Sequence, residues 1–195
     1  NPKWYSDAQL QLEHFHAVQP FDTFRYLNAD GSTICTIPSY ARVADPRKVS
    51  MPGGAWLMRR DAYDALGGLL ECHIMGGGDH FFASAFFNDF HAHGVFRQQL
   101  LKDWIVRVKA LANQPFVPRR WGNPPISFVT GTVSHLYHGQ LEHRQYGTRD
   151  VMLSAFGFNP VKHLTKNADG VIQLVGQPEL QSLIATYFYS RKENE

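Results

Sequence analysis

The chain has 195 residues, a length that fits one domain with a hydrophobic core of useful size. Its net charge is only +2 and its Lys and Arg residues are scattered, which argues against a nucleic-acid-binding face. The composition is 44% hydrophobic and 18% charged, as in soluble globular proteins, and no apolar run approaches the roughly 20 residues that span a bilayer. We therefore expect a single domain over residues 1–195, without a membrane span or a nucleic-acid partner.

The two cysteines, Cys35 and Cys72, are too few for a disulfide framework or a thiolate zinc site. This usage favours a reducing compartment, and we expect the protein to be cytoplasmic. The chain opens with NPKWYSDAQL, without a methionine or a targeting pattern. That opening is expected of a segment cut from a longer protein.

The first third of the chain predicts two helices and a strand. The stretch SDAQ has the Ser-x-x-Gln form of a capping box, and apolar residues follow it at helical spacing, which predicts a helix over residues 6–16. The alternating TICTI, bounded by DGS and a proline, predicts a strand or a hairpin arm over residues 33–37. Asp61 is placed to cap a short helix that ends at Gly67-Gly68.

Seven of the 16 glycines lie between Gly53 and Gly78, in PGGAW, GG and IMGGGDHFF. Glycine is useful where φ is positive or where another group approaches the backbone closely. Phenylalanines at every fourth residue then predict a helix over residues 79–93, whose N-terminal dipole keeps Asp79 ionised. An ionised carboxylate can accept a proton or orient a hydroxyl. The alternative is that Asp79 only caps its helix.

The second half of the chain predicts three helices and extended segments. An apolar stripe indicates a helix over residues 100–111, and the proline-rich PFVPRRWGNPP follows it. The stretch ISFVTGTVSHLYHG is rich in β-branched and aromatic residues and predicts a strand or a hairpin. A helix over 142–156, a strand at VIQLV and a helix over 178–192 with Pro178 in its first turn complete the chain. The mixture indicates an α/β or α+β fold.

Two clusters near residue 140 carry chemically useful side chains. His135 and His138 are candidate metal ligands, but residues three apart on a continuous strand point to opposite faces, so they converge only if the strand ends between them. Arg144 and Arg149 flank Tyr146, and the arginine fork suits phosphate or carboxylate. The alternatives are structural histidines and a solvated helix face.

Two stretches, taken in order, resemble the C-terminal half of nucleotide-sugar glycosyltransferases of the GT-A fold, family 2-like and galactosyltransferase-like: PGGAWLMRRDAYDALGGLLECHIMGGGDHFF and HLYHGQLEHRQYGTR. In that family a glycine loop with an aromatic residue precedes Arg-Arg-x-x-[Phe/Tyr]-x-x-x-Gly-Gly, and a glycine-rich segment ending in acidic residues then opens a helix. Galactosyltransferase-like members carry Glu-Asp where this chain has Gly78-Asp79. The family's metal-binding Asp-x-Asp, which precedes a segment like NPKWY, does not occur in this chain.

The resemblance implies an α/β fold, namely a partial GT-A-like mixed sheet flanked by helices that lacks most of the N-terminal nucleotide-binding units. It implies transfer of a sugar from a nucleotide-sugar donor to a hydroxyl of a carbohydrate or other acceptor. Asp79 would bind the acceptor hydroxyl or act as the general base. The other substrate-binding residues would come from the glycine motifs and the arginine segment: Gly53, Gly54, Ala55, Trp56, Gly77, Gly78, His80, Arg144, Tyr146 and Arg149.

In the complete enzyme the resemblance implies a divalent cation, Mn²⁺ or Mg²⁺, near His135 or His138. The chain alone is expected to bind nucleotide sugar weakly or not at all. A truncated sheet exposes an edge, and we expect self-association into a homodimer to cover it.

Two other functions remain open. A non-catalytic carbohydrate-binding or assembly domain is favoured by the tryptophans Trp56, Trp104 and Trp121, of which Trp104 lies on an apolar stripe. A metal-dependent hydrolase has no HExxH signature here, and the His-x-His pair that comes nearest to a ligand set is His91-Ala92-His93, at the end of the predicted helix over 79–93. Its ligands would be drawn from His73, Asp79, His80, His135 and His138.

Overall fold

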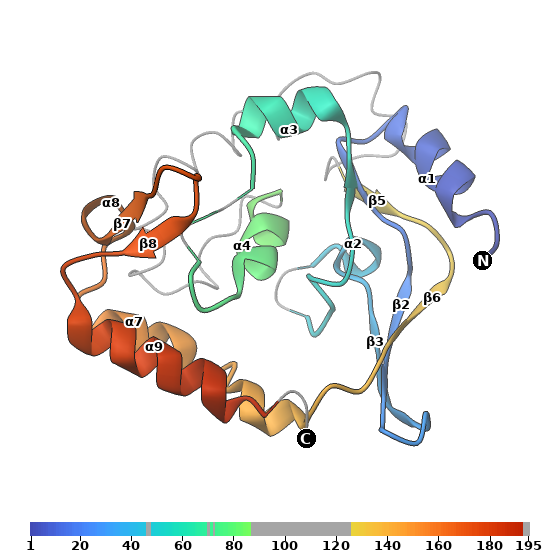
Figure 1. Ribbon diagram of the computed structural model, residues 1–195. Helices are drawn as coiled ribbons and strands as arrows, with labels where there is room; N and C mark the ends of the chain where they lie inside the picture. The colour runs from blue at the N-terminus through green and yellow to red at the C-terminus, as the bar shows by residue number, and fades with distance from the viewer. Residues whose placement is uncertain (46–47, 70, 72, 87–125, 193–195) are drawn as a thin grey trace. The chain divides into compact units, whose positions relative to one another are not determined.

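The structure is a computed structural model that describes residues 1–45, 48–69, 71, 73–86 and 126–192 (Figure 1). The chain divides into two compact units, each described here by itself. The first unit comprises Asn1–Leu70 and Gly78–Tyr137, and the second comprises Glu71–Gly77 and His138–Glu195. This division does not test the expectation of a single domain over residues 1–195, which stays a prediction.

The first unit contains two small mixed sheets with helices beside them. In the first sheet β1 pairs in parallel with β5 and antiparallel with β4. In the second, β2 and β3 form a hairpin and β6 runs parallel to β2, as Figure 1 shows. The elements are α1 (Trp4–Leu12), β1 (Ala17–Gln19), β2 (Thr23–Leu27), β3 (Thr33–Pro38), α2 (Tyr40–Val43), β4 (Leu57–Met58), α3 (Arg60–Leu66), α4 (Gly78–Ala85), β5 (Ile126–Phe128) and β6 (Thr132–His135).

Aromatic and small apolar residues from many elements fill the interior of the first unit. Ala8 and Phe15 pack with Val18 and Val129, but α1 ends at Leu12, so of this pair only Ala8 is a buried residue of the helix. The large buried side chains around the glycine motifs are Phe21, Phe24, Tyr40, Phe81, Phe82 and Phe86. The parallel strand pairs and flanking helices make this a mixed α/β structure, which confirms the coarse fold class.

The second unit contains a hairpin and several helices. Its elements are the 3-10 helix η1 (Leu141–Arg144), α7 (Arg149–Ala155), α8 (Pro160–His163), β7 (Leu164–Lys166), β8 (Ile172–Leu174) and α9 (Pro178–Ser190). Strands β7 and β8 pair antiparallel. The Asn159 side chain accepts hydrogen bonds from the first amides of α8, and Pro178 begins α9 as predicted. Leu180 and Tyr187 are the buried residues of α9, whereas Phe188, placed by its spacing on the same stripe, is 47% exposed.

Three sequence predictions need correction. Helix α1 starts at Trp4, before the predicted capping box, and its N-cap Lys3 makes no side-chain cap. The stretch from residue 126 forms two strands in two different sheets and not a hairpin. The predicted helix over 142–156 breaks because Gln145 adopts a left-handed conformation, which ends η1 before α7 begins.

Other predicted elements agree with the structure as far as it is described. The strand at TICTI is β3, the helix that ends at Gly67 is α3, and VIQLV contains β8. Helix α4 covers the first part of the predicted helix over 79–93, whose remainder lies outside the described residues, as does the predicted helix over 100–111. Among the described residues, no helix is long and apolar enough to cross a membrane.

Candidate functional site

The PGGAW loop, residues 52–56, lies against the first turn of α4. An added Cβ at Gly53 would overlap Oδ2 of Asp79 and lie 3.4 Å from its Cγ. Gly53 is buried, while Asp79 is exposed. The two glycine motifs therefore meet at this point, and the absence of a side chain at residue 53 is what lets the carboxylate sit against the loop.

A second contact joins the PGGAW loop to α4. The indole of Trp56 packs edge-on against the ring of Phe82 in α4, with the ring centroids 5.4 Å apart. The indole N–H donates to the carbonyl of Pro52 at 2.8 Å, so the loop is also closed on itself. Trp56 is partly buried and thus acts first as a packing residue that fixes the loop beside α4.

The two middle residues of the loop face different surroundings. Gly54 has a φ of +90°, and an added Cβ would lie 2.9 Å from the Phe24 ring and 3.0 Å from the Phe21 ring, so glycine is required on two counts. Ala55 lines a cavity of about 360 Å³ together with Trp4, which is 43% exposed. An exposed indole beside a small side chain offers an apolar wall for a ligand such as a sugar ring.

Buried Gln19, the last residue of β1, holds the PGGAW loop through side-chain hydrogen bonds. Its amide nitrogen donates to the carbonyls of Met51 at 3.0 Å and Gly53 at 3.3 Å. Its amide oxygen accepts from the N–H of Ala41 at 2.8 Å. Gln19 has no exposed surface, and its bonds to Gly53 and Ala41 are buried, so they tie the loop to β1 and α2 away from water.

The Asp79 carboxylate has no positively charged partner among the described residues. Its Oδ1 accepts a hydrogen bond from the N–H of His80 at 2.8 Å, and no described residue forms an ion pair with it. The imidazole of His80 packs edge-on against buried Tyr40, with centroids 6.4 Å apart. An exposed carboxylate at a helix N-terminus can accept a hydrogen bond or a proton from a ligand hydroxyl.

In the second unit Arg149 is a buried cation, only 7% exposed. Its Nε and Nη2 donate to the carbonyl of Arg144 at 3.2 and 3.0 Å. Its guanidinium lies over the Tyr146 ring at 4.5 Å and beside the Tyr187 ring at 5.6 Å. The Tyr187 hydroxyl donates to the same carbonyl at 3.2 Å. No carboxylate of the described residues pairs with Arg149.

The glycine-rich segment continues into this unit at Gly76 and Gly77. Both have positive φ, +92° and +89°, which explains glycine at each. An added Cβ at Gly76 would lie 2.6 Å from Nη1 of Arg149, so a guanidinium occupies the space that a side chain would take. Gly78 is the first residue of α4 in the first unit.

The two histidines proposed as metal ligands belong to different units. Strand β6 ends at His135, whose ring packs against Phe24 and Tyr26 with centroids 5.4 and 5.1 Å away. His138 receives hydrogen bonds from Nη2 of buried Arg144, at 2.9 Å to Nε2 and also at Nδ1. A neighbouring guanidinium opposes the binding of a second cation at this imidazole.

Within the described ranges no group of three or more His, Cys, Asp or Glu side chains is placed to hold a metal ion. His91 and His93, with Trp104 and Trp121, lie outside the described residues.

Comparison with known proteins gives no match to this chain among family models, curated proteins or solved structures.

The structure brings Gly53, Trp56, Asp79 and His80 together in one unit, and Arg144, Tyr146 and Arg149 in the other. Sequence reasoning missed Gln19, although a polar residue inside the apolar AVQPF stretch is a usable signal for a buried hydrogen-bonding role. It also missed the burial of both arginines, because it assigned them to one continuous helix with a solvated face as the alternative.

Proposed function

We propose that the protein is part of a glycosyltransferase that moves a sugar from a nucleotide-sugar donor to an acceptor hydroxyl. The observation that carries the proposal is the contact of Asp79 with Gly53, because it joins the two motifs on which the glycosyltransferase resemblance rests. Ala55, two residues after Gly53 in the PGGAW loop, also lines a cavity together with the partly exposed indole of Trp4.

The chemistry assigned to Asp79 is that of a general base. The carboxylate takes the proton of the acceptor hydroxyl while that oxygen bonds to the anomeric carbon of the donor sugar. The bond from this carbon to the nucleoside diphosphate breaks, and its electron pair leaves with the diphosphate. Asp79 suits the role because it is exposed and forms no ion pair with a described residue.

Arg149 supports a diphosphate-bearing donor. A cation that is 7% exposed is costly to bury without an anion, and the described residues offer it no carboxylate. A phosphate group would supply the missing charge and use the guanidinium donors that Arg144 leaves open. Tyr146, 57% exposed beneath the guanidinium, offers a ring for a ligand to contact.

The experiment is a transfer assay with the protein of the complete gene and a panel of radiolabelled nucleotide sugars. We expect Asp79→Asn to lower the turnover number about 100-fold or more, since general base catalysis contributes roughly 10²- to 10⁴-fold. Asp61→Asn is the matched control, a first-turn carboxylate in α3 paired with Arg59, and it should retain activity. Equal turnover by wild type and Asp79→Asn would exclude this role for Asp79.

A second candidate is a non-catalytic carbohydrate-binding domain, favoured by the cavity of Trp4 and Ala55. It predicts sugar binding that survives Asp79→Asn and falls in Trp4→Ala, with no transfer from any donor. The Mn²⁺ or Mg²⁺ requirement, the cytoplasmic location and the homodimer remain proposals for the complete protein. Metal analysis of purified His135→Ala against wild type tests the hydrolase alternative.

A further inference from the structure

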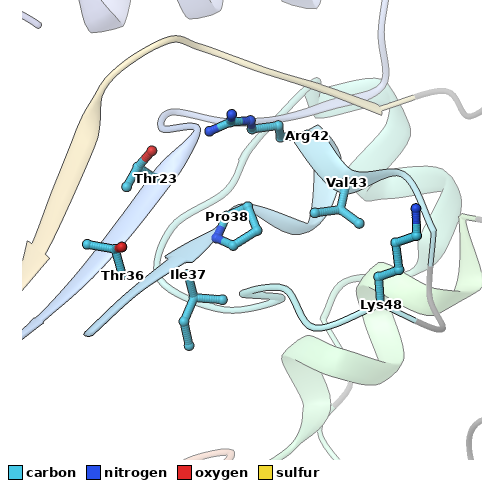
Figure 2. A pocket seen from close by; sticks show the side chains of 7 residues that line it. All are labelled: Thr23, Thr36, Ile37, Pro38, Arg42, Val43 and Lys48. Atoms are coloured by element: carbon cyan, nitrogen blue, oxygen red, sulfur yellow. The ribbon is translucent and has the colours of Figure 1, made fainter. Parts of the chain in front are cut away.

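A separate cavity of about 480 Å³ lies in the first unit beside the edge strand β3 and helix α2. Among the described residues, it shares no lining residue with the cavity at Ala55. Figure 2 shows Thr23 and Thr36 at one end, Lys48 at the other, and Pro38 and Val43 between them. The volume falls within the range of about 300 to 1,000 Å³ typical of small-molecule sites. We call it the Arg42–Lys48 cleft.

The charged groups of the cleft leave an excess of positive charge. Arg42 lies 3.7 Å from Asp22, and its side chain remains 50% exposed, so part of the guanidinium stays available. Lys48 is exposed and pairs with no carboxylate of the described residues. Two cations against one nearby carboxylate favour an anionic ligand group.

Hydroxyl groups line the same end of the cleft as Arg42. In the β2–β3 pairing Thr23 lies opposite Pro38 and Arg25 opposite Thr36, so the two threonines are diagonal neighbours on one face. Neither hydroxyl makes a hydrogen bond with the described residues. Since a hydroxyl both donates and accepts, this pair suits a ligand that carries hydroxyls of its own.

We propose that the Arg42–Lys48 cleft binds an anionic saccharide, a sugar carboxylate or a sugar phosphate, as part of the acceptor. The anionic group contacts Lys48 or Arg42, and the sugar hydroxyls contact Thr23 and Thr36. Pro38 and Val43 provide the apolar floor on which a sugar ring packs. The identification of the ligand as a saccharide rests on the proposed glycosyltransferase function, whereas the preference for an anion rests on the cleft alone.

The test is an NMR titration of the chain with four probes: glucuronate, glucose 6-phosphate, neutral glucose and inorganic phosphate. We expect at least one acidic sugar to bind roughly tenfold more tightly than glucose, the effect of one charge-assisted hydrogen bond. The acidic sugar that binds identifies the anion as carboxylate or phosphate. Inorganic phosphate binding as tightly as glucose 6-phosphate, with no binding of glucuronate, would mean an adventitious anion site and overturn the proposal.

Variants locate the binding. Lys48→Ala and, separately, Arg42→Gln should each weaken the acidic sugar roughly tenfold and leave the affinity for glucose unchanged. Lys162→Ala removes an exposed lysine of α8 and is the matched control, expected to bind as wild type. If both cleft variants fold, by their unchanged NMR spectra elsewhere, and bind the acidic sugar as wild type does, the cleft is not the site.

Asp79→Asn separates this inference from the proposed function. The Asp79 carboxylate does not line the cleft, so the variant should bind the acidic sugar with wild-type affinity while it loses transfer. Loss of transfer in Asp79→Asn without acidic-sugar binding in wild type would overturn the acceptor proposal and leave the glycosyltransferase proposal standing. Binding of the acidic sugar in the cleft of a protein that never transfers sugar would overturn the glycosyltransferase proposal and leave the anion site standing.

Discussion

Two aspartates lie in the first turns of helices in the first unit, and the surroundings of their carboxylates differ. Asp61 in α3 and Asp79 in α4 each accept a hydrogen bond from the next residue's N–H, at 2.9 and 2.8 Å. Asp61 is also clasped by the Arg59 guanidinium through two bonds of 2.9 and 2.6 Å, whereas Asp79 lies against Gly53 and pairs with no described cation. An aspartate in the first turn of a helix is therefore ion-paired in α3, whereas in α4 it has no charged partner among the described residues.

The difference separates a structural acid from a candidate functional one. The hydrogen bond from Arg59 lowers the pKa of Asp61 below its usual value, so that group stays ionised and engaged. The Asp61 carboxylate in turn raises the pKa of Arg59. Asp79 lies instead against Gly53 of the PGGAW loop, which Gln19 holds through a buried hydrogen bond, and its carboxylate forms no ion pair with a described residue.

The largest expected effect on stability comes from Gln19→Leu, which removes the hydrogen bonds that hold the PGGAW loop. The Ala41 N–H and the Gly53 carbonyl would lose their Gln19 partner, while the Met51 carbonyl keeps the Tyr40 N–H, and we expect about 3 kcal/mol less stability toward unfolding. Urea denaturation measures the change. The control is Gln9→Leu, an exposed glutamine of α1, expected to stay within about 0.5 kcal/mol of wild type. Equal losses in the two variants would contradict a special role for Gln19.

A smaller effect is expected from Gly53→Ala, which places a methyl group where Oδ2 of Asp79 lies. Crowding should cost about 1 kcal/mol of stability and displace the carboxylate. With Asp79→Ala the cost should vanish, because the Cβ of residue 79 would lie at an ordinary 3.8 Å from the new methyl. The double-mutant cycle should thus give a coupling of about 1 kcal/mol.

The matched control for that cycle is Gly147→Ala, a glycine with no atom within 4 Å of an added Cβ and no positive φ. We expect it to be neutral or slightly stabilising, since alanine restricts the unfolded chain. Additivity of Gly53→Ala and Asp79→Ala would show that the two residues do not touch in solution.

The smallest effect concerns Asp61. Because its folded pKa lies below the ordinary 3.8, its stabilising contribution is present above that pH and is lost as pH falls through the lower folded value. The side chain is 61% exposed, so screening limits the contribution to about 0.5 kcal/mol. Asp61→Asn should therefore destabilise slightly at pH 7, with the difference from wild type shrinking in acid. A gap that widens in acid would give the wrong sign.

Sequence patterns anticipated the features that depend on neighbours along the chain. The glycine-rich turn before α4, the left-handed Gly67 that ends α3 and the proline that begins α9 all follow from local backbone preferences. The break at Gln145 was missed because a non-glycine residue with φ of +50° gives little signal in the sequence. Because of this break, Arg144 and Arg149 lie in two separate helices, and the buried Arg149 guanidinium donates to the Arg144 carbonyl.

The sequence by itself determined that a carboxylate follows three glycines at the start of a helix, since glycine conformation and helix dipole act over a few residues. It likewise determined the mixture of helices and short strands. The tertiary structure alone decided that Gly53 lies against the Asp79 carboxylate and that buried Gln19 donates hydrogen bonds to the carbonyls of Met51 and Gly53. Such pairings depend on which distant segments pack together, and side-chain packing leaves no periodic mark along the chain.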